Sequence, residues 1–98
     1  ASTSIDCYLG VALAKAGRRS EAEAILKRLE TTKEYVSPVE LAELYAGLDK
    51  KEEALAALER AYAAHDLQMQ FLGIDPFLDP LHSEPRFQEI IRKVGLPQ

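Results

Sequence analysis

Apolar residues recur every three or four positions in several short stretches of the chain, with polar residues between them. The stretch 37–66 carries two such series, one through Leu41 and Leu44 and the other through Leu55 and Leu58. This spacing places the apolar side chains on one face of a helix. It predicts two amphipathic helices that lie antiparallel, because only a short turn joins them.

The residues before each of these helices resemble helix starts. A serine hydroxyl at Ser37 can accept a free amide proton, Pro38 suits the first helical position, and Glu40 can reach back to the cap. Asp49 and Glu52 have the spacing of a second capping box. We therefore expect the second helix to begin after Asp49.

The first part of the chain predicts a similar pair of helices. Residues 3–16 read as a helix that Gly17 ends, and its expected inward side consists of Ile5, Leu9, Ala12, Leu13 and Ala16. Ser20 and Glu23 offer a capping box for the next helix, although the repeat described next would start it slightly earlier. The inward residues of that helix are Ala22, Ile25, Leu26 and Leu29.

The two pairs of helices share one spacing. Leu9-Gly10, Leu13, Ala22 and Leu26 are followed, at an offset of 32 residues, by Leu41-Ala42, Tyr45, Ala54 and Leu58. Two copies of one unit predict like surroundings for Leu9 and Leu41, and for Ala22 and Ala54.

This spacing resembles the tetratricopeptide repeat, whose pattern combines a large residue, Leu-Gly, an aromatic residue and a later small-large pair. The resemblance implies an all-α, right-handed α-α superhelix of two helical hairpins, 3–34 and 37–66. The match is incomplete, because Asp6 and Pro38 stand where the family prefers a large aromatic residue. The family's closing proline is also absent from both copies.

The repeat pattern stops after Asp66, and 67–98 is expected to be a turn-rich cap with a final helix. Asp75-Pro76 and Asp79-Pro80 each suggest a cap followed by a first-turn proline. The last helix, opened by Ser83-Glu84-Pro85, has one apolar face and ends at Gly95; that face consists of Phe87, Ile90, Ile91 and Val94. Because this tail is rich in large apolar residues, we expect it to fold back over the open end of the hairpin stack.

The stretch 35–97 also resembles the carboxy-terminal segment of bacterial multi-repeat proteins, in which such hairpins follow a winged-helix, kinase or cyclase domain. The similar residues are Val36-Ser37-Pro38, Tyr45-Ala46-Gly47-Leu48, Asp75-Pro76, Asp79-Pro80-Leu81, Glu84-Pro85-Arg86-Phe87 and Gly95-Leu96-Pro97. The resemblance implies a larger regulatory protein of which this chain is a terminal part.

Composition narrows the class of protein. With 98 residues, 47% apolar and 29% charged, the chain matches one folded domain. No apolar run reaches the ~20 residues of a membrane span, so we expect no membrane insertion and a cytoplasmic location. A net charge of −4 disfavours nucleic acid as a partner. The single Cys7 excludes an internal disulfide and fits a reducing compartment.

Candidate catalytic groups are scattered. His65 and His82 belong to no recognisable ligand set, and Cys7 has no adjacent base that would make it a nucleophile. The acidic residues form no isolated pair for general acid-base work, and no glycine-rich phosphate loop is present. We therefore expect no enzymatic activity, no cofactor and no metal.

Binding is then the expected role, and another protein or peptide is the expected partner. In the tetratricopeptide family the first helix of each hairpin lines a concave groove, which implies Ser4, Cys7, Val11, Ala14, Lys15, Val36, Val39, Glu43, Ala46 and Gly47 as groove residues here. The family's carboxylate clamp is absent, because Val11 and Glu43 occupy its asparagine positions. Two alternatives remain open: self-association as a homo-oligomer, and a small-molecule pocket beside Tyr45, Tyr62 and Phe71.

Overall fold

A computed structural model describes the backbone of residues 3–95, together with all of their side chains except those of Leu67 and Phe71. All regular structure in this range is helical, which confirms the expected all-α class. The α-helices are α1 (Thr3–Lys15), α2 (Arg19–Thr31), α3 (Pro38–Gly47), α4 (Lys51–Ala63) and α5 (Pro85–Val94). Two 3₁₀ segments, η1 (Leu67–Ile74) and η2 (Pro76–Leu81), join α4 to α5.

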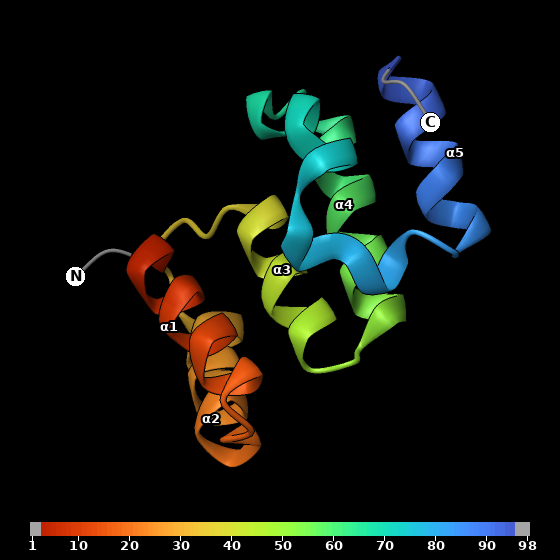
Figure 1. Cartoon of the computed structure of the whole chain (residues 1–98). Helices are drawn as coiled ribbons and strands as arrows, with labels where there is room; N and C mark the ends of the chain where they lie inside the picture. The colour runs from red at the N-terminus through yellow and green to blue at the C-terminus, as the bar shows by residue number, and fades with distance from the viewer. Residues whose placement is uncertain (1–2, 96–98) are drawn as a thin grey trace.

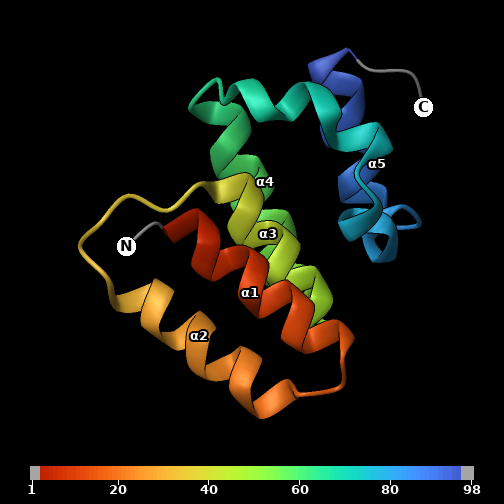
Figure 2. The ribbon, with the colours of Figure 1, turned by 60° about the vertical axis from the view of Figure 1, so that its left-hand side comes forward.

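The first four helices form two hairpins that lie side by side. α1 packs against α2, α3 packs against α4, and α1 also packs against α3 (Figures 1 and 2). As a result α3 is central, with α1, α4 and η2 as its main neighbours. α1 lies at the edge, with α2 and α3 as its main neighbours.

The turns inside the two hairpins are alike. Gly17 and Asp49, which are 32 residues apart, both take the left-handed conformation, with φ values of 80° and 61°. The helices that follow, α2 and α4, are 13 residues long each and begin at the same offset. Backbone bonds between N and O match pairwise: Arg18 to Leu13 (2.9 Å) with Lys50 to Tyr45 (2.8 Å), and Ala22 to Arg18 (3.1 Å) with Ala54 to Lys50 (3.0 Å).

These backbone bonds explain why two predicted capping boxes are wrong. α2 and α4 follow Arg18 and Lys50, and neither residue caps its helix through the side chain. Ser20 lies inside α2, and Asp49 serves the end of α3 instead of the start of α4. Because each turn closes through its backbone, the next helix begins without a side-chain cap.

The predicted start of α3 is confirmed in part. The Ser37 hydroxyl accepts a hydrogen bond from the Glu40 amide at 3.4 Å, and Pro38 occupies the first helical position. The Glu40 carboxylate, however, accepts a hydrogen bond from the Ser4 hydroxyl at 2.6 Å. Ser37 thus caps α3 as predicted, whereas the Glu40 carboxylate links α3 to α1.

The predicted inward face of α1 is wrong except at Leu13, which is partly buried and packs against the core. The side chains of Ile5, Leu9, Ala12 and Ala16 are exposed, whereas Cys7, Gly10 and Val11 are buried. The expectation of like surroundings holds for Ala22 and Ala54, both fully buried, but not for the leucine pair. Leu9 is 48% exposed and Leu41 only 8%. The difference arises because α3 has a helix on each side, whereas α1 lies at the edge.

The tail covers the second hairpin. η2 packs on α3, and α5 packs on α4 (Figure 1). Large side chains of the tail are fully buried there, namely Leu72, Leu78, Leu81 and Phe87. Asp75 caps η2 as predicted, but Asp79 and Pro80 lie inside it and not at a new start. Gly95 ends α5 with a φ of 88°, as expected, while Leu96-Pro97 lie outside the described residues.

Candidate functional site

The predicted groove residues do not surround an open groove. Val11, Cys7, Val39, Glu43 and Ala46 are buried, Ser4, Ala14 and Val36 are partly buried, and Lys15 and Gly47 are exposed. The structure does bring these positions of α1 and α3 together, because the two helices pack against each other. Of this set only Lys15 and Gly47 are exposed in this conformation.

The protein's own tail occupies the face that these residues were predicted to offer. η2 packs on α3, and the ammonium of Lys15 lies 5.1 Å from the ring centroid of Phe77 in η2. Asp75, which caps η2, is close enough to Glu43 to influence its ionisation. The segment 75–81 thus covers this face and contacts both α1 and α3.

Glu40 is the polar link between α1 and α3. Its carboxylate accepts hydrogen bonds from the Ser4 hydroxyl at 2.6 Å and from the Tyr8 hydroxyl at 3.3 Å. The negative charge of Glu40 raises the pKa of Tyr8 above its ordinary value. This arrangement holds the first turns of the two helices together.

The Glu43 carboxyl is buried, and its surroundings do little to stabilise a negative charge there. Its Oε1 has no hydrogen-bond partner within residues 3–95. Burial, followed by the Asp75 carboxyl and the charge of Glu40, raises the pKa of Glu43 to about 9. At neutral pH the group is therefore protonated and uncharged, which is the form a buried site tolerates.

The cysteine and the two histidines lie apart from one another. Burial, with smaller effects from the charges of Glu40 and Glu43, raises the pKa of Cys7 to about 12, so its thiolate is scarce. His65 lies in the turn after α4 and has a φ of 56°. The ring centroid of His82 lies 5.0 Å from that of Phe87. Within residues 3–95, no three His, Cys, Asp or Glu side chains are grouped so that they could hold a metal ion.

Of the helices within residues 3–95, α1 exposes the most large apolar side chains. Ile5, Tyr8 and Leu9 are all about half exposed or more, and Ala12 and Ala16 extend the same face. Figure 2 shows α1 on the near side of the molecule, flanked by α2 and α3. Four of these residues, Ile5, Leu9, Ala12 and Ala16, were predicted to lie in the core. A usable signal was the offset, since Ala12 corresponds to the larger Leu44 in the second hairpin.

Comparisons with known proteins do not assign the chain to a family. A scan against protein-family models, a search of curated proteins and a search of solved structures each found no match to the chain. No helix within residues 3–95 has both the length and the apolar composition that crossing a membrane requires.

Proposed function

We propose that this protein is a tetratricopeptide-like helical-repeat module that acts by binding another protein, within a larger regulatory protein. Two features support the proposal. The turn geometry of the first hairpin recurs at an offset of 32 residues, and the first helices of the two hairpins pack side by side. Repeats of this kind build their surfaces by stacking equivalent units, and those surfaces bind other molecules.

The docking surface in this proposal is the exposed face of α1, defined by Ile5, Tyr8, Leu9, Ala12 and Ala16. The observation that carries it is the contrast between Leu9, 48% exposed, and its counterpart Leu41, 8% exposed. The corresponding face of α3 includes Leu44, which packs against Gly10 of α1. By analogy, the α1 face fits a further helix of the same kind, lying against α1 as α1 lies against α3.

The side chains of this face indicate what the partner helix must carry. Ala12 of α1 corresponds to Leu44 of α3, and Ala16, just after α1, corresponds to Leu48, just after α3. A helix that packs here therefore fits best when large apolar residues fill the space at the two alanines, because empty space in a packed interface forfeits contacts. The partner is thus an apolar helical hairpin, from the same polypeptide or another.

An extended chain tests the proposal directly. A second copy of residues 3–34 placed before Thr3 keeps the 32-residue register and puts its own Gly10 opposite Ala12 of the original copy. We expect the extended chain to unfold at a temperature several degrees higher, because a new interface is buried. Ala12→Leu in the original copy should raise it further, since it recreates the contact between Leu44 and Gly10.

The matched controls separate docking from general effects. Ala12→Leu in the unextended chain should leave the unfolding temperature almost unchanged, since residue 12 is exposed there. Leu9→Glu in the original copy of the extended chain should remove the gain. An added copy that exchanges its amide protons like an unfolded peptide, with no rise in unfolding temperature, would refute the docking surface.

Self-association is a second candidate, favoured by the arrangement of large and small side chains on α1. In an antiparallel pair of α1 helices, Leu9 of one copy would face Ala12 of the other, and Ile5 would face Ala16. Sedimentation velocity from about 5 µM to 1 mM distinguishes this case. A dimer lost in Leu9→Glu but kept in Ile74→Glu, which alters another exposed apolar residue, supports it. A monomer throughout the range rejects it.

A further inference from the structure

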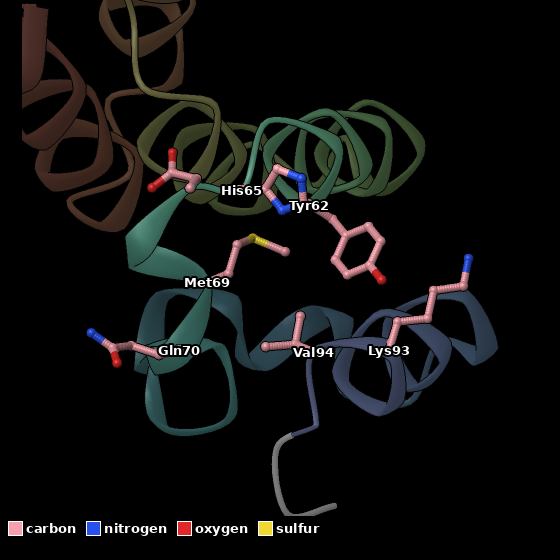
Figure 3. Close-up of a pocket in the computed structure, with 7 residues that line it drawn as sticks. Tyr62, His65, Met69, Gln70, Lys93 and Val94 are labelled. Atoms are coloured by element: carbon pink, nitrogen blue, oxygen red, sulfur yellow. The ribbon is translucent and has the colours of Figure 1, made fainter.

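A cleft lies between the end of α4, η1 and α5, at the other end of the molecule from α1. Its volume is about 280 Å³, and it is lined by Tyr62, His65, Asp66, Met69, Gln70, Lys93 and Val94. Figure 3 shows the side chains of Tyr62, Met69 and Val94 converging on the same space, with Gln70 turned away from it. The volume is near the lower end of the range of ligand pockets, which fits a molecule with a single ring.

The floor and walls of the cleft are apolar. Met69 is buried at its base, whereas the ring of Tyr62 is 40% exposed. Val94 is partly buried and packs against the core. An aromatic ring would gain contact with the face of Tyr62 and with the Met69 thioether, both of which pack well against π systems.

The polar groups of the cleft favour a negative charge. The ammonium of Lys93 lies 6.0 Å from the ring centroid of Tyr62. It forms no ion pair within residues 3–95, although it is close enough to the Glu59 and Glu89 carboxylates to act on their ionisation. The imidazole of His65 borders the cleft beside Tyr62 (Figure 3). Asp66 is the acidic group on the lining, but its Oδ1 accepts a hydrogen bond from the Gln68 amide at 2.9 Å and caps η1. A ligand anion would therefore meet the ammonium of Lys93, with the His65 imidazole beside it.

Backbone geometry supports a preformed site. His65 has a φ of 56°, an uncommon conformation for a residue with a side chain. The bond from the Asp66 amide to the Ala61 carbonyl, 3.0 Å long, holds the backbone of this turn. The remaining side chains come from the end of α4, from η1 directly after it, and from α5 further along the chain.

We propose that this cleft binds a small aromatic carboxylate, with its ring between Tyr62 and Met69 and its carboxylate at Lys93. This goes beyond protein binding, because the cleft shares no residue with the α1 face. Binding here would link a small molecule to the packing of the tail on α4.

A titration with three matched probes tests the proposal in the intact chain. Phenylacetate, benzyl alcohol and benzylamine carry the same ring with a negative, neutral and positive group. We expect phenylacetate to shift the methyl NMR signals of Met69 and Val94 saturably, with a Kd of about 1–10 mM for so small a ligand. Benzyl alcohol should bind roughly three- to fivefold more weakly, because it lacks the charge that would pair with Lys93 and an exposed ion pair contributes about this much.

Charge reversal provides the sharper measurement. Lys93→Glu should reverse the order of affinities, so that benzylamine binds better than phenylacetate. Because Lys93 is exposed, the substitution should not disturb folding. Lys33→Glu, which alters another exposed lysine outside the cleft, should keep the original order. Shifts that stay linear with probe concentration, or a preference that Lys93→Glu leaves unchanged, would overturn the proposal.

Discussion

Leu44 of α3 fills the space that the missing side chain of Gly10 leaves on α1. A Cβ placed on Gly10 would lie 2.9 Å from Cδ1 of Leu44 and 3.0 Å from its Cδ2. Both distances are shorter than normal carbon contacts, and Leu44 is fully buried. The glycine is therefore what allows the two hairpins to approach each other this closely.

Gly10→Ala should destabilise the protein by about 1 kcal/mol, because overpacking at Leu44 outweighs the better helix propensity of alanine. Urea unfolding followed by circular dichroism measures it. Gly47→Ala is the matched control, since its added Cβ would meet only the Ala14 Cβ, at an ordinary 3.6 Å. That variant should be neutral or slightly stabilising. Equal losses at both positions would contradict the packing explanation.

Glu43 makes stability depend on pH in an unusual direction for a carboxyl. Its pKa is about 9 in the folded protein and close to 4.5 when exposed, so the folded state holds one more proton between these values. Stability that is complete below about pH 4.5 is therefore lost as the pH rises towards 9, by up to about 1.4 kcal/mol per pH unit. Chemical unfolding at pH 5, 6, 7 and 8 measures this slope.

Glu43→Gln removes the titrating group and isolates its contribution. The variant should lose most of the slope between pH 5 and 8 and be more stable than the parent at pH 8. Glu53→Gln, at an exposed position of α4, should keep the parent slope. If the stability of Glu43→Gln changed with pH as steeply as that of the parent, another group would be responsible for the slope.

The sequence predicts the helices of this fold better than the way they meet. The equal lengths of α2 and α4 agree with the 32-residue offset, and Gly17 marks the first turn because glycine readily takes positive φ. The same turn at Asp49 was missed, because aspartate also signals a helix cap. Choosing between the two roles needs the backbone bonds of the turn, which the sequence does not contain.

Burial was harder to predict where a helix is apolar on more than one side. α1 has one apolar series through Ile5 and Leu9 and another through Cys7 and Val11, and only the position of α3 decides between them. The groove was predicted from the resemblance to the tetratricopeptide repeat, in which the first helix of each hairpin lines it, and the sequence does not show that 75–81 packs there. Its packing on α3 depends on tertiary contacts of Leu78 and Leu81, which are fully buried.

Tyr45 connects α3 to α2 through a hydrogen bond from its hydroxyl to the Glu30 carboxylate at 2.6 Å. Burial and this bond raise the pKa of Tyr45 to about 12. Tyr45→Phe should therefore cost about 1 kcal/mol of unfolding free energy. Tyr35→Phe, which alters a tyrosine that is largely exposed, should cost almost nothing. A double-mutant cycle with Glu30→Gln assigns the loss to the bond, and additive losses would show that the bond contributes nothing.

Cys7 should report the opening of the interface between α1 and α3. Its side chain is fully buried, and a pKa of about 12 leaves little thiolate to react at pH 8. Iodoacetamide should therefore modify the folded protein only through its open state, whereas the unfolded chain reacts at once. Gly10→Ala weakens the same interface and should speed the reaction about fivefold, in proportion to the loss of stability when reclosing is fast. Tyr35→Phe leaves that interface intact and should react at the parent rate. Native Cys7 that reacts as fast as a free thiol would mean that the two hairpins do not stay packed in solution.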